Sequence, residues 1–226
     1  MLSIVTGTLD RLECVKKLVK NTVEANEKLE LVLVDGGSSD GTTEYIKQLN
    51  HPRINLIEEG RRSYYWDYMN KGIKASKYEW VCQWNDDLAL ENPWRDVLEL
   101  LESENPADFY LFSWREPTGR YVIYDSPEEI VMNYGIYNKK IFREIGMYNS
   151  SYKYYCCDGD MSFRAREFGY RYQSLHHIRC NPLTDSPEQK KALWENIPQE
   201  QSNYKECLNL YRNKVIPDTV ELLKDK

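Results

Sequence analysis

The first half of the chain alternates short apolar runs with segments whose apolar residues recur at helical spacing, and no other feature constrains the fold as strongly. Strands that alternate with helices predict a parallel sheet with helices on both faces. The predicted strands cover residues 2–5, 29–34, 54–57 and 79–84, and the predicted helices cover residues 10–23, 42–49, 64–75 and 94–101. We therefore expect an α/β fold with a Rossmann-like, mostly parallel central sheet.

The second half of the chain is less regular. Its predicted elements are strands at residues 109–114, 120–124 and 170–175 and helices at residues 139–145 and 158–168. After Pro182 the sequence becomes polar, with helical segments near residues 187–194 and 199–212. We expect a domain over residues 1–180, followed by a small, mainly helical C-terminal extension over residues 181–226.

Polar clusters follow three of the predicted strands at the point where each strand ends, at residues 6–10, 35–40 and 85–87. Ligands of open α/β sheets bind beyond the carboxyl ends of the strands, so we expect the clusters to meet at one edge. Asp10 opens the first helix, and Glu13 three residues later completes a capping-box pattern.

Charge and cysteine content restrict the partners and the compartment. The chain has 226 residues, a net charge of −6 and no basic stripe, so nucleic acid is not an expected partner. Its six cysteines form no CxxC pair, which favours reduced thiols in a cytoplasmic protein. No window approaches the roughly 18 apolar residues of a membrane span. We expect a soluble protein, with peripheral association to a membrane and the oligomeric state left open.

The first motif, VDGGSSDGT at residues 34–42, combines a tight glycine turn with a carboxylate. Asp35 can accept hydrogen bonds from a nucleobase or a ribose. The sequence lacks both the Gly-Lys-Ser/Thr ending of a phosphate-binding Walker loop and the GxGxxG pattern of a dinucleotide loop. The alternative is a strand–turn–helix junction whose Asp and Ser residues cap the next helix.

The second motif, QWNDDLAL at residues 83–90, places an amide and two carboxylates at the end of an apolar strand. Adjacent carboxylates repel each other unless a cation or solvent relieves them. Their oxygen atoms suit Mg²⁺ or Mn²⁺, which would neutralise charge on a diphosphate. The alternative is a solvated acidic turn.

The third motif, at residues 154–171, places Asp158 and Asp160 at a predicted helix start. One of them, if it faces a cleft, can accept a proton from a hydroxyl group, and helix capping is the alternative. His176 and His177 follow the next predicted strand and are either a third metal ligand or structural histidines.

Cationic side chains are expected near the same sheet edge. Arg61 and Arg62 follow the third predicted strand, and Lys71 lies on the next helix. A guanidinium can bind phosphate or stack on a base, and surface solvation is the alternative for each of these residues.

Taken together, these segments resemble the family 2-type glycosyltransferases with the GT-A fold over about residues 2–177. LSIVTGTLDR at residues 2–11 looks like the family's first strand and its short polar loop. VDGGSSDGT is close to the family's VDDGSxDGT, with Gly36 in place of the second Asp. YYWDYMNKGIKASKYEWVCQWNDD resembles the family's DAMNKGI…GEYI…NSDD arrangement, and residues 136–170 follow its helix, turn, acidic pair and R…GY ending. Four motifs in the family's order are far more specific than any one of them.

The resemblance implies an inverting glycosyltransferase that moves a sugar from a nucleotide-diphosphate donor, with a UDP-sugar favoured, to a hydroxyl of a glycan or other acceptor. It implies Asp158 as the general base and Mn²⁺ or Mg²⁺ held by Asp87 with His176 or His177. The donor half covers about residues 1–90 and the acceptor half about residues 91–180. The implied donor-binding residues are Thr6, Thr8, Asp10, Arg11, Asp35, Gly36, Arg61, Arg62, Asp67, Asn70, Lys71, Asn85 and Asp86.

Two positions depart from the family pattern. Asn85 replaces the first Asp of the DXD motif, which implies a metal held less tightly or through water. Cys157 stands where Glu usually precedes the base, which leaves the choice between Asp158 and Asp160 less secure. A sugar nucleotidyltransferase and a non-catalytic domain that binds a nucleotide sugar or a glycan are the alternative functions.

Overall fold

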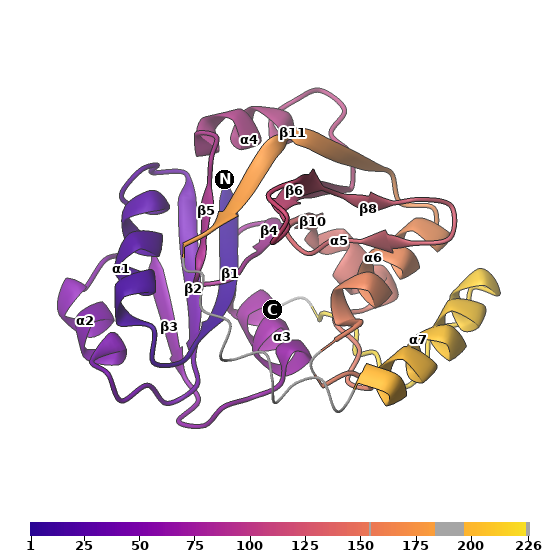
Figure 1. The fold of residues 1–226 in the computed structure, drawn as a ribbon, viewed down its shortest axis with the longest axis horizontal. Helices are drawn as coiled ribbons and strands as arrows, with labels where there is room; N and C mark the ends of the chain where they lie inside the picture. The colour runs from indigo at the N-terminus through magenta and orange to yellow at the C-terminus, as the bar shows by residue number, and fades with distance from the viewer. Residues whose placement is uncertain (154, 184–196, 225–226) are drawn as a thin grey trace.

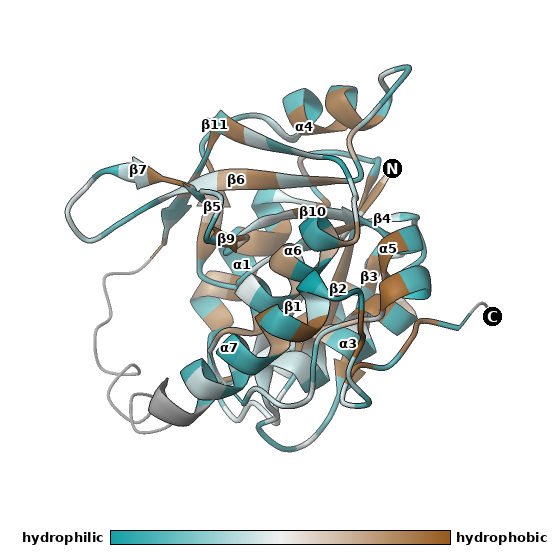
Figure 2. Ribbon diagram, turned by 90° about the vertical axis from the view of Figure 1, so that its right-hand side faces the viewer, coloured by the Kyte–Doolittle hydropathy of each residue, from teal (hydrophilic) through white to brown (hydrophobic). Residues whose placement is uncertain are grey.

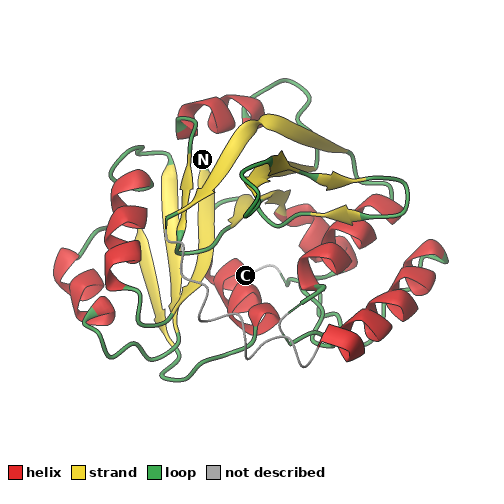
Figure 3. Cartoon of the chain, in the orientation of Figure 1, coloured by secondary structure: helices red, strands yellow, loops and turns green. Residues whose placement is uncertain are grey.

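The computed structural model describes residues 1–153, 155–183 and 197–224. The alternation expected for the first half is confirmed. Its elements are β1 (Leu2–Thr8), α1 (Leu12–Asn21), β2 (Leu29–Asp35), α2 (Thr42–Leu49), β3 (Ile54–Glu58), α3 (Tyr65–Ala75) and β4 (Trp80–Gln83). Figure 3 shows the strands side by side with helices around them.

The second half contains more strands than the sequence indicates. Its elements are β5 (Leu88–Leu90), α4 (Trp94–Leu101), β6 (Phe109–Arg115), β7 (Tyr121–Val122), β8 (Tyr124–Asp125), β9 (Ile130–Val131), β10 (Gly135–Asn138), α5 (Lys139–Ile145), α6 (Cys157–Glu167), β11 (Tyr172–Pro182) and α7 (Ile197–Arg212). The expected pairing of the strands at 109–114 and 120–124 is confirmed by Trp114 opposite Val122. The helix expected at 187–194 lies outside the described residues.

Within the described residues, the main sheet has the strand order β3-β2-β1-β4-β10-β6-β11-β5, with β7 paired to β6. Strands β1 to β4 are parallel, β10 is antiparallel to both β4 and β6, and β11 runs parallel to β6. The carboxyl ends of β1 to β4 and β6 and the start of β10 therefore share one edge, which we call the carboxyl rim. Its strand-end residues are Thr8, Asp35, Glu58, Gln83, Arg115 and Gly135.

Hydrophobic clusters on both faces of the sheet confirm the expected helical cover (Figure 1). Residues Ile4 and Leu31 belong to the cluster that contains buried residues of α1 and α4, whereas their neighbours Val5 and Val32 belong to the cluster with α3, α5 and α6. This change of face from one residue to the next is the period of a strand. Figure 2 shows apolar colouring along the strands and a mostly hydrophilic α7.

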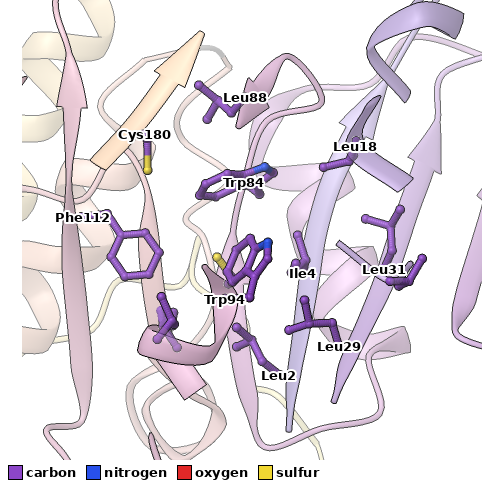
Figure 4. Packing of buried hydrophobic residues seen from close by; sticks show 14 of the residues in the cluster. Leu2, Ile4, Leu18, Leu29, Leu31, Trp84, Leu88, Trp94, Phe112 and Cys180 are labelled. Carbon is purple, nitrogen blue, oxygen red and sulfur yellow. The ribbon is translucent and has the colours of Figure 1, made fainter. Parts of the chain in front are cut away.

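Trp84 anchors the chain just before the acidic turn at residues 85–87. It is 1% exposed, and its ring lies 5.4 Å from that of Trp94 and 5.9 Å from that of Tyr134, centroid to centroid. Figure 4 shows both tryptophans packed beside the strands. Full burial of a large apolar side chain contributes about 1.5–3 kcal/mol, so this end of β4 is held firmly.

The C-terminal residues pack against the rest of the fold. Helix α7 contributes Cys207 and Tyr211 to the second hydrophobic cluster. The Met147 N–H donates to the Glu221 carbonyl (2.8 Å), and the Leu223 N–H donates to the Phe142 carbonyl (2.9 Å). Among the helices of the described residues, none has the length and apolar character that crossing a bilayer requires.

Candidate active site

The loops after β1 and β2 are joined by hydrogen bonds at the carboxyl rim. The Gly36 N–H donates to the Thr8 carbonyl (2.9 Å), and Asp10 Oδ1 accepts from the Ser39 N–H (2.7 Å). The expected capping role of Asp10 is wrong. Asp10 lies before the helix with φ 52°, and the Leu12 N–H donates to Asp40 Oδ2 (2.8 Å) instead. The second loop therefore caps the helix of the first.

Asp35 organises its own loop. Its side chain accepts from the N–H groups of Gly37 and Ser38 (3.0 Å each) and from the Thr43 hydroxyl (3.1 Å). Asp35 is 2% exposed, so its carboxylate is engaged by these donors and shapes the turn, as the junction alternative expects.

The loop after β3 reaches the rim through a close backbone contact with the loop after β2. Gly37 has φ +92°, and a Cβ placed on it would lie 2.9 Å from the Gly60 carbonyl carbon. A Cβ on Gly36 would lie 3.4 Å from the Arg62 Cα. The glycines of the second loop thus bring Arg61 and Arg62 to the rim, as expected from the sequence.

Charged side chains of the third loop and α3 form a network beside this contact. Lys71 Nζ lies 3.0 Å from Asp67 and also pairs with Glu59, and Arg61 lies 3.8 Å from Asp67. Exposed pairs such as Arg61–Asp67 contribute about 0–1 kcal/mol, so the Arg61 guanidinium can turn toward an anion at little cost.

The acidic turn after β4 faces the loop after β1. The Thr8 hydroxyl donates to Asp86 Oδ2 (2.7 Å), and Arg11 forms an ion pair with Asp87 (3.1 Å). Burial raises the pKa of Asp86 to about 6, although the Thr8 hydrogen bond and the Arg11 charge act against this rise. Asn85 donates to the Tyr134 hydroxyl at 3.4 Å. Asp86 and Asp87 thus share one cationic partner, Arg11.

Asp158 lies in the first turn of α6, where its Oδ1 accepts from the Gly159 N–H (2.9 Å). Solvent reaches one edge of the side chain, while protein atoms surround most of it. Burial raises the pKa of Asp158 to about 6. A carboxyl group with that pKa is ionised near neutrality and basic enough to accept a proton.

Asp160 has a different environment. It is fully buried, and its carboxylate accepts from the hydroxyls of Tyr211 (2.6 Å) and Tyr152 (2.9 Å) and faces Arg164 at 3.6 Å. These partners give Asp160 a structural role. Of the two carboxylates, Asp158 is the one that solvent reaches.

Asn133 is a site residue that the sequence did not indicate. With its amide oxygen accepting from Trp114 Nε1 (2.8 Å), its amide nitrogen donates to Asp158 Oδ2 (2.9 Å). The assignment follows from chemistry, because an indole N–H can only donate. Asn133 lies two residues before Gly135, the rim residue at the start of β10, and β10 is too short to stand out as a pattern.

Two tyrosines, Tyr68 and Tyr134, are affected by the charges of both the acidic turn and Asp158. The pKa of Tyr68 is raised by burial and by the negative charges of Asp86 and Asp158. The pKa of Tyr134 is raised by burial and by the charges of Asp87 and Asp158. Carboxylates that are 71 residues apart in the sequence, Asp87 and Asp158, thus act on one ring at the rim.

Four of the expected residues are not brought to this group. Thr6 is 1% exposed and donates to the adjacent Gly7 carbonyl. Both the nitrogen and the oxygen of the Asn70 amide bond to the backbone of Tyr148 (2.9 Å each), so Asn70 joins α3 to the segment before Tyr152.

His176 and His177 are both exposed and lie in the register shift of β11, between Leu175 and Arg179. Just beyond the end of β11, the Leu183 N–H donates to the Asp87 carbonyl. The histidines lie earlier in the chain, where the stretch from Leu175 to Arg179 advances by one residue of β6. Among the described residues, neither histidine joins Asp87 in a group of three or more potential metal ligands.

The described residues contain no group of three or more His, Cys, Asp or Glu side chains that could hold a metal ion. Mg²⁺ commonly takes one or two protein carboxylates and completes its shell with water and substrate phosphates. Asp86 and Asp87 supply that smaller set, with Asn85 as a neutral oxygen ligand beside them. Their mutual repulsion, which Arg11 relieves in this structure, shows that a cation fits here.

The chain is similar to known proteins in both sequence and structure. The model of a family described as glycosyl transferase family 2 matches residues 3–170. The mannosyltransferase PcManGT from Pyrobaculum calidifontis, solved in complex with GDP-Man and Mn²⁺, aligns with a TM-score of 0.65 at 14% identity and covers 93% of this chain and 68% of that chain. S. aureus TarS 1–349 in complex with UDP aligns with a TM-score of 0.63 at 16% identity, over 94% of this chain and 71% of that chain. A search of curated proteins finds no match.

Proposed function

We propose, from the premise that this chain belongs to glycosyl transferase family 2 and is a glycosyltransferase of the GT-A fold, that it transfers a sugar with inversion from a UDP-sugar to an acceptor hydroxyl. The observation that carries the proposal is the convergence of Asp158 with the acidic turn: Asn85 donates to the Tyr134 hydroxyl at 3.4 Å, and the neighbouring Asn133 donates to Asp158 at 2.9 Å. One carboxylate then serves the acceptor, and the other two serve the diphosphate.

The donor is expected to lie across the loops after β1, β2 and β3. The related structures contain GDP-Man, UDP and UDP-GlcNAc, which are all nucleotide diphosphates or their sugars. Arg61 and Arg62 carry the positive charge that such a ligand needs in a chain of net charge −6. Asp35 acts by shaping the loop on which the nucleoside rests, because its carboxylate is engaged within that loop.

In the transfer step, the acceptor oxygen attacks the anomeric carbon while Asp158 takes the hydroxyl proton. The bond from the anomeric carbon to the phosphate oxygen breaks, and the nucleotide diphosphate leaves from the opposite face with the electron pair. The configuration at the anomeric carbon therefore inverts. A carboxylate is a weak base for an alcohol, so proton transfer accompanies bond formation late in the step.

Asp87 and Asp86 would hold the divalent ion, and Arg11 would turn from Asp87 toward the diphosphate. When it is bound, the ion neutralises charge on the leaving diphosphate. Arg11 and the loop cations hold the remaining phosphate oxygens through charge-assisted hydrogen bonds.

A two-stage experiment tests the proposed function. A thermal-shift screen of UDP-sugars with and without Mn²⁺ identifies the donor, because a ligand that binds the folded state raises Tm. NMR of the transfer product then reports the anomeric configuration. Retention of configuration, or a donor that binds equally well to Asp87→Ala with Mn²⁺ present, would contradict the proposal.

A further inference from the structure

Asn133 cannot rotate its amide without losing a hydrogen bond. An amide group is normally ambiguous in orientation, because its oxygen and nitrogen are similar in size. Trp114 removes the ambiguity, since its indole N–H has no acceptor capacity and requires the Asn133 oxygen. The Asn133 nitrogen is therefore directed at Asp158 as a donor.

The backbone around Asn133 is also fixed. Gln83 Nε2 donates to the carbonyls of Met132 (2.8 Å) and Asn133 (2.9 Å), and its oxygen accepts from the Tyr148 hydroxyl. The Met132 N–H donates to Ser162 Oγ on α6 (3.1 Å). The segment before β10 is thus tied both to β4 and to the helix that carries Asp158.

Asp158 depends on such a donor because burial disfavours its ionised form. The described residues contain no ion pair of Asp158, whose carboxylate bonds to the Gly159 N–H and the Asn133 amide. The titratable groups whose charges act on it, or on which its charge acts, are those of Tyr65, Tyr68, Tyr134, Tyr137, Tyr148, Cys156, Cys157 and Tyr204. None of these groups is a cation.

We propose that Asn133, oriented by Trp114, is a positioning residue for Asp158. It holds Oδ2 in place and stabilises the carboxylate, while the Gly159 N–H holds Oδ1. The catalytic consequence of this role rests on the proposed function. The effect on the Asp158 carboxylate itself does not depend on which reaction the protein catalyses.

The test is a ¹³C NMR titration of the aspartate carboxyl groups in the wild-type protein and in Asn133→Leu, with Asp158→Asn used to assign the signal. Loss of a donor to the ionised form raises a carboxyl pKa. We expect the pKa of Asp158 to rise by about one unit in Asn133→Leu, since a hydrogen bond to a charged group has that size. Trp114→Phe keeps an aromatic ring but frees the amide, so it should move the pKa in the same direction by less.

The control is Asn55→Leu, which removes another half-buried amide whose contact is the Ala75 carbonyl at 3.4 Å. It should leave the Asp158 titration unchanged. In turnover of the UDP-sugar found in the donor screen, Asn133→Leu should lower kcat about tenfold at pH 7, keep the donor KM, and move the acidic limb upward in pH.

An unchanged Asp158 titration in folded Asn133→Leu would overturn the proposal. If that variant does not fold, the Trp114→Phe titration decides in the same way. The titration needs no substrate. A wild-type protein without any transferase activity would therefore count against the proposed function, while the NMR result would still judge the positioning role.

Discussion

At the scale of single residues, the site is governed by carboxyl groups whose environments differ. Asp158 keeps a solvent-accessible edge, Asp160 is enclosed by two tyrosines and Arg164, and Asp86 is buried beside Thr8. In the proposed mechanism, the same functional group therefore serves as a proton acceptor, a structural anchor and a ligand for cations. The pattern of neighbours, and not the residue type, assigns the role.

Replacing Asp158 with Asn should separate binding from turnover. The amide keeps the shape of the side chain but cannot take up the acceptor proton. We expect kcat to fall by roughly 10²–10⁴-fold with the donor KM nearly unchanged, measured as UDP release in the presence of acceptor. Wild-type kcat in this variant would remove Asp158 from its proposed role.

The pH dependence of turnover follows from the raised pKa of Asp158. The group must be ionised to accept a proton, and burial raises its pKa to about 6. We expect kcat to rise as the pH increases through about 6 and to level off above it. A limb near the ordinary aspartate pKa of about 4 would show that a different group controls the rate.

The buried carboxylate of Asp158 should lower the stability of the fold at neutral pH. A carboxyl group whose pKa is higher in the folded state than in the unfolded state favours folding below its unfolded pKa, and this contribution is lost as the pH rises through about 6. We expect the free energy of unfolding of Asp158→Asn to exceed that of the wild-type protein by about 1–3 kcal/mol at pH 7.5. Near pH 4 we expect no difference. Chemical denaturation at both pH values measures this. Asp218→Asn, at an exposed position, is the control that should change little.

At the scale of elements, a close approach of α3 to β1 places part of the site. Gly72 lies where a Cβ would come within 2.2 Å of Val5 Cγ1, so the absence of a side chain lets the helix lie against the strand. α3 carries Tyr68 and Asp67 to the rim and is joined through Asn70 to Tyr148. A shift of α3 would therefore move Tyr68 and Asp67 and would disturb the contact with Tyr148.

Gly72→Ala tests that contact. The added methyl group must displace the helix or Val5, which costs about 1–3 kcal/mol, while the helix propensity of alanine returns up to about 1 kcal/mol. We expect a net loss of about 1–2 kcal/mol in denaturant unfolding. The double variant Gly72→Ala/Val5→Ala should lose less stability than the sum of the losses in the two single variants. Strict additivity would show that the two residues do not compete for the same space.

The order and type of the elements in the first half could be predicted, because each has a clear period and a polar end. The position of His176 and His177 could not be predicted. The predicted strand stops at residue 175, which puts His176 beyond a strand end, but β11 continues to Pro182 through an irregularity held by the Ser113 hydroxyl. The series of hydrogen bonds from Trp114 through Asn133 to Asp158 could not be predicted either, because it joins three separate segments and leaves no local pattern in the sequence.

At the scale of the whole molecule, the C-terminal segment is bonded to the start and to the interior of α6. Glu200 on α7 accepts from the N–H groups of Lys153 (3.1 Å) and Tyr155 (2.5 Å), just before α6 begins. Tyr211 on the same helix donates to Asp160. Residues from the far end of the chain thus hold both the approach to α6 and its interior.

Tyr211→Phe should show this dependence. The substitution keeps the ring but leaves a fully buried carboxylate with one hydrogen bond fewer, which costs about 1–3 kcal/mol. We expect a lower Tm in calorimetry with the donor KM retained. Tyr121→Phe is the matched control, since it loses a hydroxyl that donates to Asn181 at 2.7 Å in a partly exposed hairpin. Equal losses in the two variants would argue against a special role for Tyr211.

The spacing of Asp158 and Asp160 along α6 has a geometric consequence. Successive residues of an α-helix are rotated by about 100° around its axis, so two residues apart means about 200°. Because Tyr152, Tyr211 and Arg164 hold Asp160 on the inner side of α6, Asp158 is directed to the opposite side, where the Gly159 N–H and the Asn133 amide meet its carboxylate. The direction in which Asp158 points is thus set in part by side chains on the other side of the helix, which hold Asp160.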